Sequence, residues 1–289
     1  MRCGSAWVAA LAISACGACG ACEKSHGTAP AGEAHRIVSL GPSTTEALFA
    51  IGAGDRLVAR SRYCDWPPEA TKLPAVGGLE PDIEAILQLG PDLVVGPSGQ
   101  WSGRFSETMH AHGIATWFPD EIQSLGAVDA LILGLGERTG HAAEARDVDA
   151  RLAAREAAIE KATAGAPRPR VLLVAGLGPI VVAGPHNFAD DLLRRAGASN
   201  VMTDGGSWPT VGFERLVELD PDVILDASVA ETGGATHITP DAQGWSGVRA
   251  VREGRVMPVS DERVLRPGPR IAEGLAVLAR ALHPDTAIP

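Results

Sequence analysis

The body of this sequence is nearly free of cysteine. Of its five cysteines, four lie within the first 22 residues, and only Cys64 stands beyond them. No intramolecular disulfide can therefore stabilise the folded part. Because no evident base adjoins Cys64 in the sequence, we expect a partly buried, unreactive thiol at this position.

The sequence also lacks an excess of positive charge and the short motifs of several enzyme classes. Its formal net charge is −10, which argues against a nucleic-acid partner. There is no G-x-S-x-G elbow, no phosphate loop ending in Gly-Lys-Ser/Thr and no complete G-x-G-x-x-G after a strand. The close histidine pair His110 and His112 would diverge by about 200° around a helix axis, so we expect no metal site there.

The first segment has the composition of an export signal. Arg2 precedes an apolar, Ala-rich stretch, residues 6–15, which is too short to span a bilayer. Residues 13–16, Ile-Ser-Ala-Cys, have the form of a bacterial lipobox and predict diacylation of Cys16. An ordinary secretory signal, cut at a later small residue, is the alternative. We expect a signal peptide at 1–15 and a lipid-anchored flexible tether at 16–35, on the periplasmic side of the cell envelope.

Short β-rich segments alternate with helical segments along the rest of the chain. This alternation predicts an α/β protein with parallel sheets. The predicted strands are residues 36–40, 57–60, 92–96, 115–118, 170–175, 180–183, 223–227 and 256–260.

A long helix separates the fourth and fifth of these strands. Val148, Leu152 and Ile159 lie on one helical face of an Ala-, Glu- and Arg-rich stretch that Gly and Pro residues end. A helix over about 142–163 would span roughly 30 Å. We therefore place an N-terminal α/β lobe at 36–138, a bridging helix at 139–166 and a C-terminal α/β lobe at 167–289.

Both lobes carry one repeated unit. Residues 83–95 and 213–225 share the pattern apolar, Glu, x, apolar, apolar, x, Leu, x, Pro, Asp and three apolar residues. This pattern predicts a short helix, a break and a buried strand. It places Glu84 and Glu214 in the first turns of equivalent helices, where acidic residues are commonly just solvated. The alternative is that the two carboxylates each meet a basic residue on one subunit of a dimeric permease.

Aromatic residues make up only 4% of the sequence, yet several tryptophans adjoin turn residues. Large residues in loops are typical of a recognition surface. A flat macrocycle needs broad apolar walls and a few polar groups, so the sequence predicts a cleft of this kind. Packing of a loop or lobe edge is the alternative for each tryptophan. The predicted walls are Tyr63, Trp66, Trp101 and Trp208, above a floor of Pro42 and Ser43.

Four stretches carry a family resemblance: residues 36–46 (RIVSLGPSTTE), 63–70 (YCDWPPEA), 91–95 (PDLVV) and 266–271 (RPGPRI). They resemble the periplasmic cobalamin-binding proteins, within the wider helical-backbone group that also takes ferric siderophores and haem. The first and third stretches are shared across that wider group, whereas the other two lean toward corrinoids. The resemblance covers essentially all of residues 36–283.

The resemblance implies two Rossmann-like lobes bridged by one long α-helix, with a ligand held in the cleft and little hinge motion. It implies that Glu84 and Glu214 dock onto a dimeric inner-membrane ABC permease with its ATPase subunits. It further suggests that Asp261 contacts the lower, nucleotide-like part of a corrinoid, a helix cap being the alternative. The sequence departs from the family after Asp261, where Glu262 and Arg263 stand in place of aromatic residues.

We therefore expect a monomeric importer component that binds a corrinoid, without turnover and without a cofactor of its own. A ferric siderophore or haem is the alternative cargo: a haem would want an axial Tyr or His, and Tyr63 is the single tyrosine. A chelatase-like tetrapyrrole enzyme is the rival from another class. Arg266 and Arg270 are expected to cap their loop or to pair with local acids.

Overall fold

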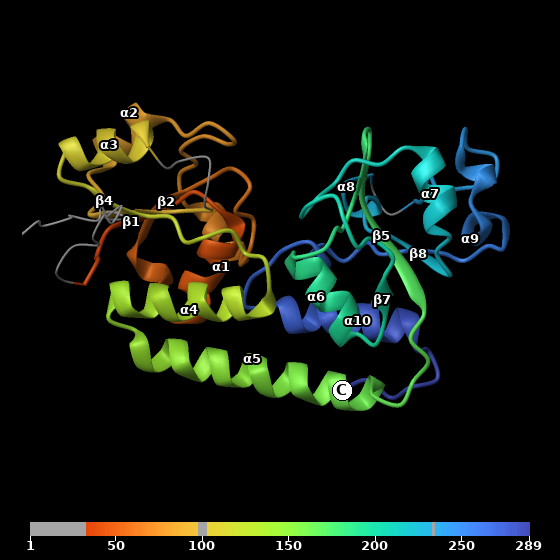
Figure 1. Cartoon of the computed structure of the whole chain (residues 1–289). Helices are drawn as coiled ribbons and strands as arrows, with labels where there is room; N and C mark the ends of the chain where they lie inside the picture. The colour runs from red at the N-terminus through yellow and green to blue at the C-terminus, as the bar shows by residue number, and fades with distance from the viewer. Residues whose placement is uncertain (1–32, 98–102, 233–234) are drawn as a thin grey trace, which may run out of the picture.

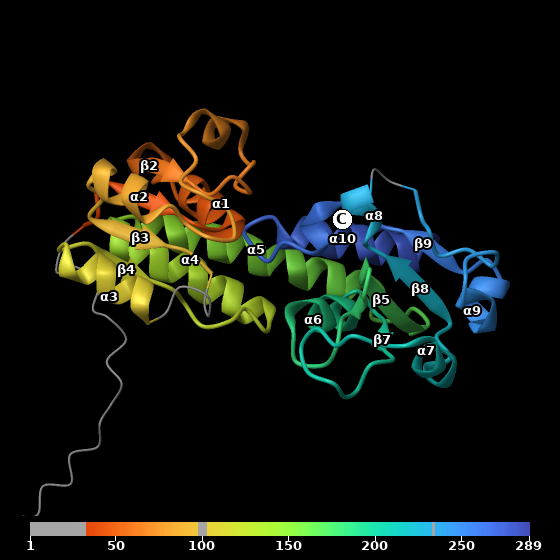
Figure 2. The same ribbon diagram turned by 90° about the horizontal axis from the view of Figure 1, so that it is seen from above.

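A computed structural model of the chain describes residues 33–97, 103–232 and 235–289. Two α/β lobes lie side by side, and the long helix α5 (Ala142–Thr163) runs beneath both (Figures 1 and 2). This confirms the helix that the sequence predicts at about 142–163. It packs against α4 (Leu125–Thr139) and against α10 (Ile271–Leu282), which follows the second lobe. Within the described residues, no helix has the length and apolar character needed to span a membrane.

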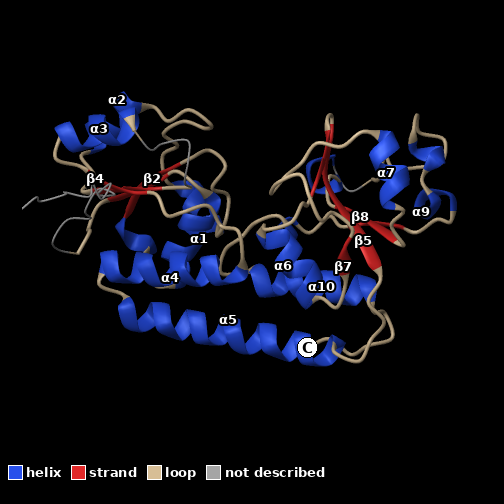
Figure 3. Ribbon diagram, viewed as in Figure 1, coloured by secondary structure: helices blue, strands red, loops and turns tan. Residues whose placement is uncertain are grey.

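The N-terminal lobe contains a parallel four-stranded sheet with the order β2-β1-β3-β4. Its strands are β1 (Ile37–Ser39), β2 (Leu57–Arg60), β3 (Leu93–Val95) and β4 (Ala115–Trp117). Its other elements are α1 (Pro42–Ala50), α2 (Ile83–Leu89), α3 (Arg104–Ala111) and the 3₁₀ turns η1 (Gly54–Arg56) and η2 (Pro68–Lys72). Helices cover both faces of the sheet (Figure 3), so its strands are largely apolar.

The C-terminal lobe contains a five-stranded sheet, in which β6-β5-β8-β9 are neighbours and β7 also pairs with β5. Its strands are β5 (Arg170–Leu177), β6 (Ile180–Val182), β7 (Ser199–Asn200), β8 (Val223–Asp226) and β9 (Val256–Pro258). Its other elements are α6 (Phe188–Arg195), α7 (Phe213–Leu219), α8 (Val229–Thr232), α9 (Arg249–Arg252), η3 (Trp245–Gly247) and η4 (Glu262–Val264).

One strand corrects the prediction of purely parallel sheets. β6 pairs with β5 in the antiparallel direction. Only Gly178 and Pro179 lie between the two strands, and a connection of two residues permits a hairpin but no crossover. The two-residue strand β7 was not predicted, because so short a segment has no periodicity to read.

The repeated unit forms the same structure in both lobes. Helices α2 and α7 each have seven residues and precede the strands β3 and β8. Each helix ends in a left-handed residue, which is Gly90 in the first lobe (φ 55°) and Asp220 in the second (φ 39°). The repeat therefore predicted both elements correctly.

The aspartate of the repeat has the same structural use in both lobes. Asp92 accepts the backbone N–H of His35 at 2.8 Å and of Arg36 at 3.1 Å, whereas Asp222 accepts that of Arg170 at 3.0 Å. The guanidinium of each arginine then donates to the carbonyl of the last helical residue, at 2.6 Å for Arg36 and 2.7 Å for Arg170. These contacts fix the repeated helix against the first strand of its lobe.

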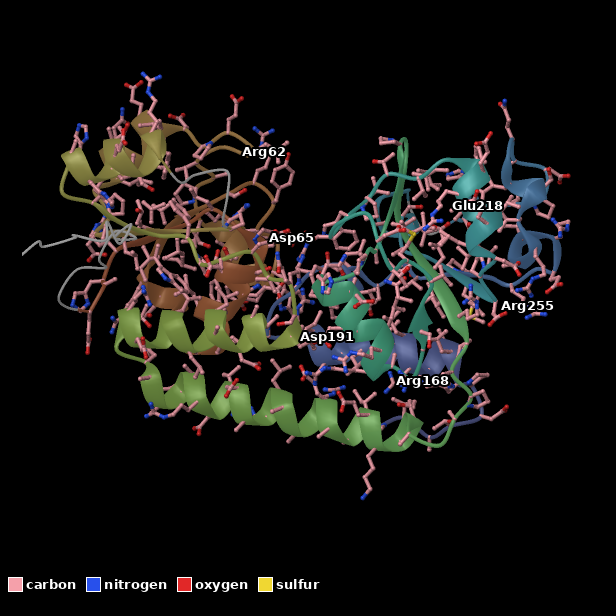
Figure 4. The ribbon with its side chains drawn as sticks, viewed as in Figure 1. Arg62, Asp65, Arg168, Asp191, Glu218 and Arg255 are labelled. Atoms are coloured by element: carbon pink, nitrogen blue, oxygen red, sulfur yellow. The ribbon has the colours of Figure 1, made fainter. Side chains whose placement is uncertain are left out.

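A buried ionic cluster joins α5 to the C-terminal lobe. Glu156 of α5 has a 5% exposed side chain and meets Arg195 of α6 at 2.9 Å. Burial raises the pKa of Glu156 to about 7, although Arg195 opposes this shift. Burial and the neighbouring Asp149 raise the pKa of Asp129, on α4, to about 6. Asp191 of α6 accepts the N–H of the first residue of α4 at 3.1 Å, so the cluster also reaches the N-terminal half (Figure 4).

Candidate functional site

A cavity of about 230 Å³ lies between the two lobes. It is located past the carboxyl ends of β1, β3 and β4, where ligands bind in open parallel sheets. The N-terminal lobe contributes residues 41–44, 96–97 and 119–122, and the other lining residues are Leu131, Phe188, Trp208 and Pro267.

The turn between β1 and α1 forms the floor of this cavity. Pro42 occupies the first turn of α1, where a missing N–H costs no hydrogen bond. A Cβ at Gly41 would come within 2.8 Å of Pro97, so only glycine lets the turn approach the loop after β3. The hydroxyls of Ser39 and Thr44 lie 2.7 Å apart beneath the turn. The structure thus holds Pro42, with Ser43 beside it, in the cavity lining.

Trp208 lies on the opposite side of the cavity, in the C-terminal lobe. Its ring meets Phe188 edge to face, with 5.8 Å between the centroids and 61° between the planes. The side chain is partly buried and packs on the main hydrophobic core. Trp208 therefore packs on its lobe, which was the alternative, and also lines the cavity, so its role as a ligand wall stays a prediction.

Tyr63 and Trp66 follow β2 and are exposed by 48% and 43%. They are not among the residues that line the cavity. Figure 4 shows Asp65, between them in sequence, on the side of its lobe that faces the C-terminal lobe. The guanidinium of Arg270, from that lobe, lies 4.6 Å from the centre of the Trp66 ring. This loop therefore lies where the two lobes meet.

The two arginines of the Arg-Pro-Gly-Pro-Arg stretch pair with acids, which confirms the prediction. Both contact Glu262 nearby in sequence. Both also contact Glu46, on α1 of the other lobe, which the sequence did not predict.

Asp261 has a structural use. Its carboxylate accepts the backbone N–H of Arg263 at 3.1 Å and so caps η4. The guanidinium of Arg263 hydrogen-bonds the same carboxylate and lowers its pKa. Asp261 is not part of the cavity lining, so its predicted contact with a ligand stays a prediction.

Other predicted residues have varied outcomes. Cys16 and Trp101 lie outside the described residues. Cys64 is fully buried, and this burial raises the pKa of its thiol, as suits an unreactive residue.

The two histidines of the close pair have different partners. His110 contacts the hydroxyl of Thr116, whereas His112 contacts a backbone carbonyl of the helix that precedes it. In the described part of the chain, no three His, Cys, Asp or Glu residues are placed to hold a metal ion.

Several lining residues were missed. Asp120 and Glu121 come soon after β4, and the rule that ligands bind at the carboxyl edge of a parallel sheet could have found them. Phe188 begins α6 in the other lobe, and no local pattern distinguishes it from an ordinary core residue. Its role is visible only because the fold brings it to Trp208.

Glu84 and Glu214 are exposed, each in the first turn of its helix. Both helices lie on the side of their lobes away from α5 (Figure 1). Each glutamate follows an exposed apolar residue, which is Ile83 (38%) in one lobe and Phe213 (36%) in the other. The lobes therefore present two similar surfaces on the same side of the molecule.

Comparison with known sequences agrees with this two-lobed architecture. The sequence model described as "Periplasmic binding protein" matches residues 37–262. The chain belongs to the periplasmic binding protein family. The ABC transporter substrate-binding lipoprotein YvrC of Bacillus subtilis is 29% identical to it over 260 residues, which cover 88% of this chain and 82% of that relative.

Two further similar proteins are named as binders of cobalamin and of haem. A protein named cobalamin-binding protein in Halobacterium salinarum is 29% identical over 262 residues, 88% of this chain and 71% of that relative. The solved haem-binding protein RhuT of Roseiflexus sp. RS-1 has a TM-score of 0.75 and 28% identity, covering 88% of this chain and 99% of that one. The protein is thus a substrate-binding component of an ABC importer, and its relatives are binding proteins rather than enzymes.

Proposed function

We propose that this protein captures a corrinoid of the vitamin B12 type in the interlobe cleft and delivers it to a dimeric ABC permease with its ATPase subunits. The name of the Halobacterium salinarum relative supports this cargo. So does the chemistry of the cavity, in which prolines, Trp208, Phe188 and Leu131 supply the broad apolar walls that a macrocycle needs.

The charge of the cavity is the observation that carries this choice of cargo. Its described lining includes Asp120 and Glu121, and none of those lining residues is Lys, Arg or His. A haem carries two propionates and many ferric siderophores are anionic, so both would need a cationic partner on losing water. The amide groups around a corrin ring are neutral and can donate hydrogen bonds to carboxylates and carbonyls. The lining therefore favours the corrinoid.

The size of the cavity indicates how such a ligand would sit. Pockets that enclose ligands of drug size measure roughly 300–1,000 Å³, whereas this cavity measures about 230 Å³. We infer that one edge of the macrocycle enters between Pro42 and Trp208. The rest of the ligand would lie in the cleft mouth, where Tyr63 and Trp66 offer exposed aromatic surface.

A haem is the second candidate, and Tyr63 is the observation that favours it. The phenol belongs to a half-exposed side chain in the loop at the lobe junction, and a tyrosine oxygen can serve as an axial ligand of haem iron. The likeness to the haem-binding RhuT adds to this case. A haem held by Tyr63 would lose its charge-transfer absorption band in Tyr63→Phe.

A calorimetric titration of the purified protein with cyanocobalamin, haem and a ferric siderophore tests the cargo. We expect saturable one-to-one binding of cyanocobalamin, weakened at least about 10-fold in Trp208→Ala, which removes a wall of the cavity. Trp117→Phe is the control, because Trp117 packs on the core under Arg138 rather than lining the cavity. Saturable binding of haem alone would contradict the corrinoid proposal and leave the importer role standing.

We further propose that Glu84 and Glu214 each meet a basic residue of the permease. A permease built from two related subunits offers two equivalent sites, and the two lobes carry one glutamate each. Glu84→Arg and Glu214→Arg should abolish corrinoid uptake by cells while leaving cyanocobalamin affinity unchanged. Glu107→Arg is the matched control, since Glu107 is also exposed in the first turn of a helix. Normal uptake in both glutamate variants would contradict the docking role.

The lipid anchor at Cys16 is also a proposal. The lipoprotein name of the Bacillus subtilis relative supports it. Cys16→Ser should move the protein from the membrane fraction to the soluble fraction and prevent its labelling by radioactive palmitate. A variant that stays labelled in the membrane fraction would point to another anchor. A wild-type protein that is itself soluble and unlabelled would point to an ordinary secretory signal.

A further inference from the structure

The segment of residues 266–270 connects η4 to α10 in the C-terminal half, yet it contacts the other lobe at several points. Pro267, in its middle, lines the interlobe cavity. Its two ends are Arg266 and Arg270, whose side chains are 17% and 19% exposed. Both arginines are therefore next in sequence, or close in sequence, to a lining residue without being part of the cavity lining themselves.

Glu46 of α1 holds Arg270 in a fixed orientation. The Nε of Arg270 donates to one carboxylate oxygen of Glu46 at 2.8 Å, and its Nη2 donates to the other at 2.6 Å. Two parallel bonds of this kind fix the plane of a guanidinium as well as its position. The Glu46 side chain is only 3% exposed, and a buried carboxylate needs such a partner. The pair therefore joins the two lobes at one defined geometry.

The same guanidinium contacts Trp66, with 4.6 Å between its carbon and the centre of the indole ring. The Nη1 of Arg266 lies 2.8 Å from a carboxylate oxygen of Asp65, the residue before Trp66. Two arginines of one lobe thus hold two consecutive residues of a loop in the other. Since Trp66 is 43% exposed, burial constrains only part of its ring. The contact with Arg270 is a further constraint on the orientation of the indole.

We infer that Arg270 is a positioning residue for ligand recognition: fixed by Glu46, it stacks on Trp66 and orients the exposed part of the indole for the bound macrocycle. The inference rests on the proposed function, because it takes Trp66 as a wall of the ligand site. A lysine cannot replace this arginine, since an ammonium lacks both the two-pronged donor and the flat surface that stacks on an indole. Part of the ligand wall is thus set by a residue of the opposite lobe.

Arg270→Lys keeps the positive charge but removes the two-pronged donor, so it separates positioning from charge. ¹⁹F NMR of the full chain labelled with 5-fluorotryptophan reports on the environment of the Trp66 ring in the absence of ligand. Trp66→Phe assigns the resonance. We expect Arg270→Lys to shift or broaden the Trp66 resonance and to leave those of Trp117 and Trp245 unchanged. We also expect cyanocobalamin to bind about 3- to 10-fold more weakly, mainly through faster dissociation.

Two further variants keep the test decisive. Glu46→Gln removes the charge that orients Arg270 and should disturb the Trp66 resonance as well. Arg255→Lys is the control, because Arg255 pairs with Glu253 rather than with Glu46, and it should leave the resonance and the affinity unchanged.

The two arms of the experiment distinguish this inference from the proposed function. An unchanged Trp66 resonance in Arg270→Lys would overturn the positioning role, even if the thermal midpoint fell, because Arg270 would then be only structural. A wild-type protein that binds no cyanocobalamin would contradict the cargo, while the NMR arm would still decide whether Arg270 orients Trp66. A disturbed resonance with full cyanocobalamin affinity would also overturn the inference.

Discussion

In the N-terminal lobe, the Asp92 carboxylate accepts hydrogen bonds from the two backbone N–H groups that precede β1. In the C-terminal lobe, the Asp222 carboxylate accepts a hydrogen bond from the backbone N–H of the first residue of β5. Glu84 and Glu214 stand eight positions earlier in the same repeat. Within the described residues, Glu84 has only a 3.5 Å contact with Gln88, and no hydrogen bond of Glu214 is seen. The fold therefore gives the repeated aspartate a hydrogen-bonding role, whereas the repeated glutamate has a favourable place in the first turn of its helix and an exposed side chain, as the proposed docking role requires.

The lobes differ where the repeated helix ends. Gly90 adopts the left-handed conformation freely, whereas Asp220 takes it with a Cβ and is met by Arg249 at 2.7 Å. Arg249 also meets Asp222 at 3.1 Å. The C-terminal lobe thus uses an additional arginine where the N-terminal lobe uses a glycine.

The largest expected effects test whether the two repeats contribute equally to the core. Ile86 and Leu216 occupy the same position in the repeat, and both are fully buried. Ile86→Ala and Leu216→Ala should each lower the free energy of unfolding by about 2–5 kcal/mol, through lost burial and the cavity left behind. Urea denaturation followed by circular dichroism measures this. A loss below about 1 kcal/mol in one variant alone would show that the lobes are not energetically equivalent.

The junction of α5 with the C-terminal lobe should make stability depend on pH. The pKa of Glu156 is raised from its ordinary value near 4.5 to about 7, so the native protein holds this proton more tightly than the unfolded chain does. The resulting stability is fully present below pH 4.5 and is lost as the pH rises through about 7. Glu156→Gln should reduce this slope and raise the stability at pH 8 by about 1–3 kcal/mol.

Denaturation curves between pH 5 and pH 8 provide the measurement for Glu156. Glu160→Gln is the control, because Glu160 meets the same Arg195 at 3.1 Å from a more exposed position. An equal slope in Glu156→Gln and in the wild type would show that burial of this carboxyl does not govern the pH dependence.

The repeated aspartates should have a smaller effect. Asp92→Ala and Asp222→Ala each remove a charged acceptor from backbone N–H groups, at an expected cost of about 1–2 kcal/mol. Asn at either position keeps an acceptor oxygen and should restore part of the loss. Chemical denaturation compares the four variants, and wild-type stability in both alanine variants would contradict the shared structural role.

The smallest effect is expected at the repeated glutamates. Glu84→Ala and Glu214→Ala should change the free energy of unfolding by less than about 0.5 kcal/mol, as for exposed residues without a structural partner. The same denaturation experiment, run beside the aspartate variants, checks this. A loss as large as that of Asp92→Ala would give the glutamate a structural explanation and weaken the docking proposal.

The sequence predicted the elements that rest on local patterns. The predicted strands, the helix at 142–163 and the repeated helices could be found because burial leaves a periodicity in the chain. The strand β6 was predicted but its antiparallel direction was missed, although the two residues Gly178 and Pro179 could have indicated a hairpin. Pro42 and Trp208, which the sequence analysis placed in one cleft, both line the cavity, and their contact with a ligand stays a prediction.

The rest of the site depends on contacts that no local pattern records. Glu46 and Arg270 are 224 residues apart, so their pairing exists only in the folded chain. Phe188 and Trp208 meet in the same way. Asp261 illustrates the opposite case, because the alternative of a helix cap came from its local sequence, and the structure shows that cap.

A crystal structure of the protein grown with cyanocobalamin would test the central claim most directly. The account predicts a corrin ring between the lobes, with one edge against Pro42 and Trp208 and with Trp66 beside its exposed part. An empty cleft at saturating cyanocobalamin, or a corrin ring bound elsewhere on the surface, would contradict it.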